Sequence, residues 1–339
     1  MRACCLGPRR NPARWLRISS WCLHAGQPIE RIRAGITPCS LPLRSQFCRP
    51  VVPGLLRKLI FLTYVAHATR ANRSSVGSGA RMSCRGELRH DSTSVTCMRC
   101  SAAFKLHGRI PVFLKEPVTI PPENHRSNPI GAEFETILRE GKDFVLHIGA
   151  GVSAQRYPNC IEFERRPFRH TDVIGDAHSL PFRAGSFDRV FAFNVFEHLA
   201  EPQKAAAEIL RVLKPGGSVA IHSAFLQAVH EAPHHYFNAT EFGLRKWFSS
   251  FEVERCHVSG NFAPGMMLAY LMSSVINTAK EGGAALDNVM RLRNTTLGEW
   301  ADLWAGTGHH PGGFEILQSL PQSAQSKIAA GFELVARKR

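Results

Sequence analysis

Two spacings of apolar residues alternate along residues 130–223 of this 339-residue chain. Short, mostly apolar runs are typical of buried strands, and they alternate with amphipathic stretches of helical spacing. The predicted strands are 144–148, 160–164, 171–175, 187–194 and 218–223, and the predicted helices are 130–140 and 202–213. This alternation is the pattern of a parallel α/β sheet whose ligand binds at the carboxyl ends of the strands.

The pattern continues less regularly after residue 223. Thr240 is suited to cap a helix. The further predicted elements are a helix at 241–248, a sixth strand at 251–258, an apolar helix at 264–279, more helix within 277–304 and a closing antiparallel strand at 331–337. We therefore expect residues 130–339 to form a Rossmann-like, doubly wound, seven-stranded sheet, with a helical insertion at about 264–325.

Charge separates the first ninety residues from the rest. They hold 16 basic and two acidic residues, whereas the whole chain has 42 basic and 27 acidic residues and a net charge of +15. The remainder carries only +1, so it has no electrostatic footprint for nucleic acid. Three interpretations of this segment are open: a transit peptide, an arm that binds nucleic acid or anionic membranes, and sequence without a folded role. We expect a disordered or non-native extension over 1–90, with Met82 as an alternative start.

Two further features of the extension bear on location. Its most apolar stretch, 59–66, is far shorter than the roughly 20 residues needed to span a bilayer, and it lies too far from the N-terminus for a secretory signal. Six of the ten cysteines lie in the extension, and the few in the body are typical of a reducing compartment. We expect a cytoplasmic protein with no transmembrane segment.

Cys97 and Cys100 form a CxxC pair ahead of an apolar run that ends at Leu114. A structural zinc ion normally takes four ligands, and no second CxxC follows. Cys84 and His107 would complete a zinc site only by coincidence. A redox-active CxxC of the thioredoxin type needs a βαβ unit around it, and that pattern is missing here. We expect a small zinc-ribbon-like hairpin over 91–120 without metal, with a zinc site and a redox pair as alternatives.

Candidate ligand-binding residues follow the first three strands of the predicted sheet. Gly149 and Gly151 let the backbone approach a ligand and leave amide groups free to bind it, although GxGxxG is not met. Glu164 ends the second strand, where a carboxylate can accept both ribose hydroxyls. Asp176 follows the third strand and can accept from an adenine amino group while a neighbouring N–H donates. Taken singly, these glycines could be turn residues and Asp176 a helix cap.

Four runs occur in order: VLHIGAG, IEFE, GDAHSLPFRAGSFDRVFAFNVFEHL and EILRVLKPGG. With these runs, residues 143–260 resemble class I S-adenosylmethionine-dependent methyltransferases of the type 11 group. The resemblance implies the class I fold, methyltransferase activity and S-adenosyl-L-methionine as cofactor. It also implies contacts to that cofactor from Gly149, Ala150 and Gly151 at the methionine portion, Glu164 at the ribose, Asp176 and Ala177 at the adenine, and Asn194 beside the sulfonium. His147, also a cofactor-site residue, stands where the family commonly has an acidic residue that orients the glycine loop or the ligand's ammonium group.

Histidines are concentrated after the fifth strand, within residues 230–240. His234, His235 and Tyr236, together with His198 after the fourth strand, are candidate proton acceptors near the methyl donor. A loop whose histidines bond to backbone carbonyls is the alternative. Adjacent His234 and His235 cannot both face one metal ion in an extended chain, so we expect no metal.

These observations predict a methyltransferase that acts on an unidentified small molecule or glycan. Methyl transfer from a sulfonium is an in-line displacement that mainly needs positioning and desolvation, so a strong base is optional. The glycan class is suggested by a run similar to PHHYFNAT in related methyltransferases near sugar-biosynthesis functions. A cofactor-binding pseudoenzyme or interaction module, motivated by His147, is one alternative. An RNA methyltransferase guided by the basic arm is the other, disfavoured by the nearly neutral body.

Overall fold

The computed structural model describes residues 87–335 and 337, apart from 92, 124, 126, 128 and 129. These residues belong to one compact unit, 51–339, and the other unit, 1–50, lies outside the described part. Most of the predicted N-terminal extension, up to residue 86, therefore lies outside the described residues.

A small antiparallel sheet opens the described chain. Its strands pair in sequence order and are β1 (Leu88–His90), β2 (Ser94–Cys97), β3 (Ala103–His107) and β4 (Ile110–Pro111). The sheet begins before the predicted boundary at residue 91, because Leu88 is buried and pairs with Cys97. Cys97 is buried at the end of β2, and Cys100 is exposed in the turn that follows.

The main sheet has five parallel strands in the order β7-β6-β5-β8-β9. They are β5 (Val145–Ile148), β6 (Cys160–Glu164), β7 (Val173–Ile174), β8 (Phe187–Phe193) and β9 (Leu213–His222). The chain runs from the central β5 to one edge and then returns to build the other, so the strand order reverses beside β5. A ligand crevice is expected at the carboxyl ends of the strands at such a reversal. The small sheet leads into the β7 edge, where the N–H of Phe113 donates to the Ile174 carbonyl (2.7 Å).

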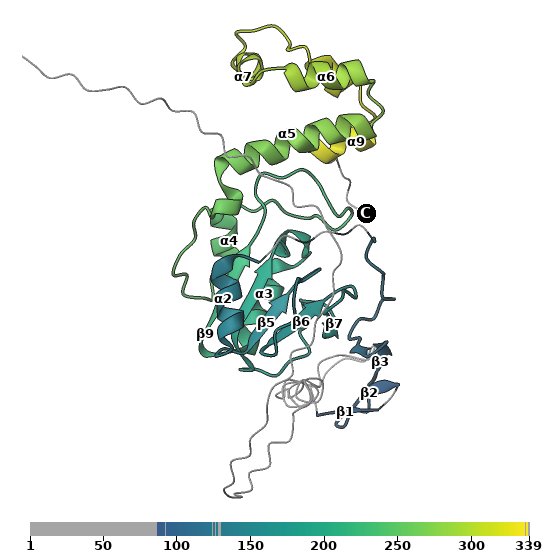
Figure 1. The fold of residues 1–339 in the computed structure, drawn as a ribbon, viewed down its shortest axis with the longest axis vertical. Coiled ribbons are helices and arrows are strands. Elements are labelled where there is room, and N and C mark those ends of the chain that lie inside the picture. The colour runs from purple at the N-terminus through teal and green to yellow at the C-terminus, as the bar shows by residue number, and fades with distance from the viewer. Residues whose placement is uncertain are drawn as a thin grey trace, which may run out of the picture. The chain divides into compact units, whose positions relative to one another are not determined.

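The helices are α2 (Ala132–Glu140), α3 (Pro202–Val212), α4 (Glu241–Trp247), α5 (Pro264–Glu281), α6 (Leu286–Asn294), α7 (Leu297–Ala305), α8 (Phe314–Gln318) and α9 (Gln322–Ile328), with the 3-10 turns η1 (Phe196–His198) and η2 (Gly260–Phe262). Helix α2 precedes β5, α3 lies between β8 and β9, and the other α-helices follow β9. Figure 1 shows α2 and α3 beside the sheet. Leu138 of α2 packs in a cluster with Val145, and Ile209 of α3 packs in a different cluster with Leu146. Because adjacent residues of a strand point to opposite faces, the two helices cover opposite faces of the sheet.

Helices α5 to α9 form a core of their own after the sheet. Its buried side chains are Ala279, Leu292, Ile316, Leu320 and Ala324. Helix α5 begins at Pro264, where the insertion was predicted to start, and runs two residues beyond the predicted end at 279. Among the described residues, no helix is both long and apolar enough to span a bilayer.

The prediction of seven strands is wrong for the part of the chain that is described, which has five strands in the main sheet. Residues 251–258 are not a strand, because Val253 and Val258 are exposed instead of packing on a sheet face. The predicted closing strand at 331–337 is also absent from the described positions there. Phe332, Leu334 and Val335 are between 73% and 88% exposed, so no core receives their alternating side chains.

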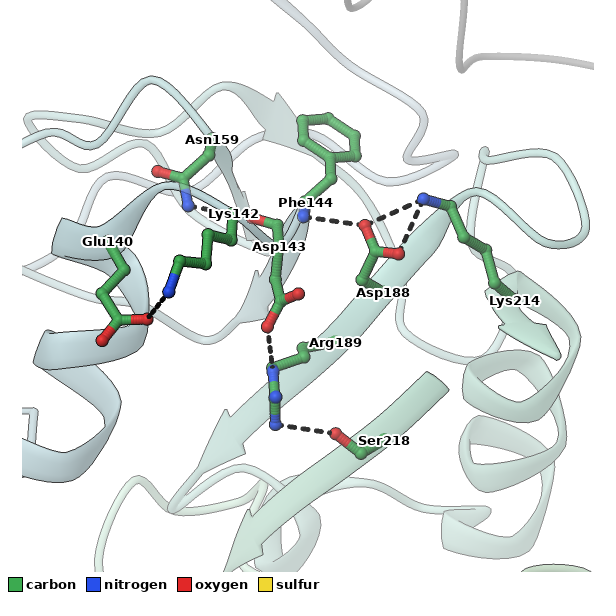
Figure 2. A network of polar contacts seen from close by, with 9 residues as sticks. All are labelled: Glu140, Lys142, Asp143, Phe144, Asn159, Asp188, Arg189, Lys214 and Ser218. Carbon is green, nitrogen blue, oxygen red and sulfur yellow. Dashed lines mark hydrogen bonds and ion pairs between the residues drawn. The ribbon is translucent and has the colours of Figure 1, made fainter. Parts of the chain in front are cut away.

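A polar network fixes the amino-terminal ends of β5, β8 and β9 (Figure 2). The Asp188 carboxylate accepts from the N–H of Phe144 (2.9 Å) and from Nζ of Lys214 (2.8 Å). Partial burial disfavours the charged form, but these two donors outweigh it and lower the pKa of Asp188. Arg189 binds Asp143 and donates to Oγ of Ser218 (3.1 Å). Asp188 therefore has a structural role at the edge opposite the carboxyl ends.

Candidate functional site

A cleft of about 2030 Å³ opens at the carboxyl ends of the main-sheet strands. Its lining comes from the segments that follow β5, β6, β7, β8 and β9 and from the beginning of α5. The predicted ligand-binding residues that line it are His147, Gly149, Ala150, Gly151, Glu164, Asp176, Ala177 and Asn194. Residues up to 47 positions apart in sequence thus meet in one cavity.

The turn after β5 is shaped for glycine at two positions. Gly149 and Gly151 have φ of 71° and 59°, a region that residues with a Cβ rarely adopt. A Cβ on Gly149 would collide with the side chain of Val195, and one on Gly151 would collide with Ser127. Oγ of Ser127 also accepts from the N–H of Val152 (2.8 Å). The turn is therefore a close-fitting backbone cradle held from two sides.

Glu164 lies at the end of β6 and is only 7% exposed. Its Oε1 accepts a hydrogen bond from the N–H of Gly151, so the carboxyl group is directly coupled to the glycine turn. Burial, together with the negative charge of Glu162 on the same strand face, raises the pKa of Glu164 to about 8. The carboxyl group is consequently mostly protonated at neutral pH in the free protein.

His147 lies in the middle of β5, two residues before the glycine turn, and is 8% exposed. Its strand neighbours in register are Glu162 and Phe191. The edge of the imidazole packs against the ring of Phe193, with 5.6 Å between ring centroids. Burial lowers its pKa to about 4, so His147 is neutral at pH 7.

Asp176 follows β7 and is anchored by His178. Its Oδ1 accepts from the N–H (2.9 Å) and from Nδ1 (2.6 Å) of His178. Burial disfavours the carboxylate, but these hydrogen bonds outweigh burial and lower the pKa of Asp176. Nε2 of His178 accepts from the N–H of Glu201, next to α3 (3.1 Å), which fixes the direction of the carboxylate. Asp176 thus accepts hydrogen bonds within its own turn, where no helix follows in the described chain before β8, and also lines the cleft beside buried Ala177.

Asn194 follows β8 with a left-handed backbone, φ 55°. Its N–H donates to the carbonyl of His222 (2.9 Å), which holds the residue at the end of β9. Within the described residues, its buried Oδ1 has no hydrogen-bond partner. Buried polar atoms normally have one, so an unpaired amide oxygen in a cleft indicates a ligand that donates to it.

The candidate proton acceptors are only partly brought together. His198, His234 and Tyr236 line the cleft, whereas His235 is not among its lining residues. Nδ1 of His198 lies 2.8 Å from the carbonyl oxygen of His234, and Nδ1 of His234 lies 3.1 Å from the hydroxyl of Tyr236. His235 packs instead on the ring of His230, with 4.2 Å between centroids.

A buried carboxyl group stands behind these histidines. Glu197 is fully buried, and burial raises its pKa to about 7. Its Oε2 accepts from Oγ of Ser223 (3.3 Å), and its backbone carbonyl accepts from the N–H of Tyr236 (2.8 Å). The histidine loop is therefore tied to the end of β8 through main-chain contacts.

Comparison with known proteins places the cleft in a family. A family model described as "Methyltransferase domain" matches residues 151–221, which include Glu164, Asp176 and Asn194. The chain therefore carries a methyltransferase domain over these residues. The matched segment contains β6, β7, β8, α3 and nearly all of β9, whereas the central strand β5 and Gly149 precede it.

Similar proteins match this methyltransferase domain over short stretches. Demethylmenaquinone methyltransferase of Renibacterium salmoninarum is 47% identical over 49 residues, which are 14% of this chain and 21% of that protein. Ubiquinone/menaquinone biosynthesis C-methyltransferase UbiE of Idiomarina loihiensis is 31% identical over 102 residues, which are 28% of this chain and 35% of that protein. The matches therefore span about a fifth and about a third of these two relatives. A solved S-adenosylmethionine-dependent methyltransferase from Aquifex aeolicus is 17% identical, with a TM-score of 0.29, and the match covers 38% of this chain and 84% of that one.

The residues at the methyltransferase cleft fit the cofactor of this family. The cradle at Gly149 and Gly151 excludes side chains, Glu164 and Asp176 place carboxyl oxygens in the cleft, and Asn194 offers an unpaired acceptor. S-Adenosylmethionine carries an ammonium group, two ribose hydroxyls and an adenine amino group, all of which donate hydrogen bonds. Donors on the ligand thus meet acceptors on the protein.

Several residues that shape the methyltransferase site were not among the predicted site residues. Ser127 had no signal, because it lies in a Pro- and Asn-rich loop 24 positions before Gly151. Glu197 could have been found as the one acidic residue in the mostly apolar run VFAFNVFEHL. His178 and His230 stand in histidine-containing runs of the sequence, but only their contacts in the structure show what they do.

Proposed function

We propose that this chain transfers a methyl group from S-adenosylmethionine to a small-molecule acceptor bound in the cleft. The observation that supports this most is that the cofactor-type residues and the histidine and tyrosine side chains line the same cavity. S-Adenosylmethionine supplies a methyl group already activated by its sulfonium centre. The protein's contribution is therefore to hold and orient two reactants and to exclude water.

Each cofactor-side residue has a distinct part in this proposal. Glu164 would accept hydrogen bonds from the ribose hydroxyls, and Asp176 would accept from the adenine amino group, with its direction set by His178. The amides of the Gly149–Gly151 turn and Oδ1 of Asn194 would bind the methionine end. All of these groups are placed by strand ends, which hold their positions more closely than loops alone do.

The acceptor side is formed by His198, His234 and Tyr236. An imidazole next to the methyl donor can take a proton from a hydroxyl acceptor as it is methylated. Burial lowers the pKa of His198, which keeps its ring neutral at pH 7. We propose a small molecule or a glycan as the acceptor. Quinone precursors are included because two similar proteins are named for quinone biosynthesis.

Calorimetric titration of the full chain with S-adenosylmethionine, and separately with S-adenosylhomocysteine, tests this function. We expect micromolar binding that Asp176→Ala weakens at least about 10-fold, because it removes a charge-assisted hydrogen bond worth roughly 1.5–3 kcal/mol. Asp188→Asn is the matched control, since Asp188 lies in the network at the other edge of the sheet and should leave the affinity unchanged. A folded protein that binds neither compound would contradict the proposal, whereas binding would justify a screen of acceptors.

His147→Asp is expected to raise the affinity for S-adenosylmethionine about 10-fold, since it supplies a carboxylate for the ligand's ammonium group. The same change should lower the stability of the free protein, because it places a carboxyl beside buried Glu162. 5′-Methylthioadenosine, which lacks the amino-acid portion, is the control ligand. An equal gain for both ligands would show that His147 does not act on the ammonium end.

A further inference from the structure

We propose that Glu197, His198 and His230 form a binding site for a divalent transition-metal ion, for which Zn²⁺ is the best match. One candidate ligand atom from each of the three residues lies within 4.8 Å of the other two. Zinc bonds of about 2.0–2.2 Å in a tetrahedral site hold ligand atoms about 3.4 Å apart, so side-chain shifts of up to about 1 Å close the site around an ion. One carboxylate and two imidazoles form a donor set that suits this ion.

The carboxyl group of Glu197 is the first reason for the assignment. The residue is 0% exposed, and Oε2 accepts a long hydrogen bond from Oγ of Ser223 (3.3 Å), with further support from the backbone N–H groups of Glu197 and Ala224. Its Oε1 is buried without any hydrogen-bond partner in the described part of the chain. An unpaired buried carboxylate oxygen is costly, and a cation among the three side chains would satisfy it.

The hydrogen bonds of the two imidazoles are the second reason. Nδ1 of His198 lies 2.8 Å from the carbonyl oxygen of His234, and Nδ1 of His230 lies 3.0 Å from that of Ala228. A carbonyl oxygen can only accept, so Nδ1 carries the hydrogen in both rings and Nε2 of each neutral ring keeps its lone pair. Metal-binding histidines are typically oriented in this way, with the second ring nitrogen donating to a carbonyl.

The neighbouring His235 is excluded as a ligand by its own contacts. Nδ1 of His235 accepts from the N–H of His230 (3.1 Å), and its Nε2 lies 3.2 Å from Oδ1 of Asn238. Both nitrogens of His235 are therefore used, and its ring supports that of His230. The expectation of no metal rested on the adjacent pair His234 and His235, whereas the proposed site joins His198 from η1 to His230 from the loop after β9.

Three protein ligands leave a fourth position of a tetrahedral ion open, as in catalytic zinc sites. His198 and His230 both line the cleft that holds Asn194 and the glycine turn. The open position would bind an oxygen of the acceptor, a hydroxyl or a carboxylate, and this part of the inference rests on the proposed function. With the ion in place, Nε2 of His198 is a ligand, so the proton-accepting role among these histidines falls to His234. The metal site itself does not depend on the proposed function.

Titration of the full chain with Co²⁺, followed by absorption spectroscopy, tests the site. Co²⁺ replaces Zn²⁺ in such sites, and its spectrum separates nitrogen and oxygen ligands from the thiolates that Cys97, Cys100 and the N-terminal cysteines would supply. We expect one ion bound with a nitrogen and oxygen spectrum. His198→Gln, His230→Gln and Glu197→Gln should each weaken binding at least about 10-fold. His234→Gln, in the same loop, should retain it, because His198 contacts only the backbone of His234.

Three results would overturn the metal site. They are a purely thiolate spectrum, unchanged binding in both His198→Gln and His230→Gln, or an equal loss in His234→Gln. Titration of every variant with S-adenosylmethionine shows separately that the cleft remains folded. Co²⁺ binding by a wild-type chain that binds no S-adenosylmethionine would refute the proposed function and leave the metal site standing.

Discussion

Glu164→Gln is expected to stabilise the free protein increasingly as the pH rises toward 8, and to weaken cofactor binding at the same time. Glutamine keeps the shape of the side chain and an oxygen that can accept from Gly151, but it has no proton to release. In the wild type, burial raises the pKa of Glu164 from 4.5 to about 8. The native state therefore holds a proton that the unfolded chain has already lost between these values, and native stability falls as the pH rises through this range.

The size of this effect follows from the width of the pH range. At 1.36 kcal/mol per pKa unit, the shift of Glu164 from 4.5 to about 8 corresponds to about 5 kcal/mol at most. Urea unfolding at pH 5, 7 and 8.5 measures the difference between Glu164→Gln and wild type. Glu197, whose pKa is also raised by burial, affects both proteins equally and cancels. Glu140→Gln, at an exposed ion pair with Lys142, is the control that should show no such trend.

Cofactor binding gives an independent measurement of the same carboxyl group. Two hydrogen bonds from ribose hydroxyls favour the ionised form, so binding at pH 7 should release a proton from Glu164. Calorimetry in buffers of different ionisation enthalpy would detect this proton, and Glu164→Gln should abolish its release and weaken binding about 10- to 100-fold. If proton release persists in Glu164→Gln, another group titrates on binding.

The sequence was sufficient to predict the centre of the fold because each of its elements carries a local signal. Strands such as Val145–Ile148 are buried on both faces, so their mostly apolar runs are easy to recognise, and glycine at 149 and 151 marks a turn that no other residue adopts easily. Parallel pairing then brings the ends of the strands together, whatever the loops do. For this reason the order of strands and turns along the chain is enough to place Glu164, Asp176 and Asn194 in one cleft.

The remaining features depend on tertiary contacts that periodicity does not encode. The alternation in 331–337 is local, but no sheet face receives Phe332 or Leu334, so no strand forms there. His235 differs from His234 only in what each contacts, since His235 bonds to His230 and Asn238. The pairing of His198 with the backbone of residue 234 spans 36 positions, and no pattern within one element predicts it.

Gly149→Ala is expected to lower the free energy of unfolding by roughly 3 kcal/mol and to abolish measurable cofactor binding. Two costs combine. A residue with a Cβ at φ 71° loses roughly 1–2 kcal/mol, and overpacking a filled space costs about 1–3 kcal/mol. The collision is with Cγ2 of Val195, which packs against the core and follows Asn194, so relief of the clash would displace the acceptor amide as well.

Two further variants separate these costs. Gly185 has a similar φ of 63° and open space around an added Cβ, so Gly185→Ala should show the backbone cost alone and leave cofactor affinity unchanged. Adding Val195→Ala to Gly149→Ala removes the colliding methyl groups and should restore part of the stability and binding. Urea unfolding and S-adenosylmethionine titration of wild type, Gly149→Ala, Val195→Ala and the double variant form a double-mutant cycle. If Gly149→Ala and Gly185→Ala lower the free energy of unfolding equally and leave cofactor affinity equally unchanged, the close approach of Val195 adds no cost. The glycine turn would then depend on backbone conformation alone.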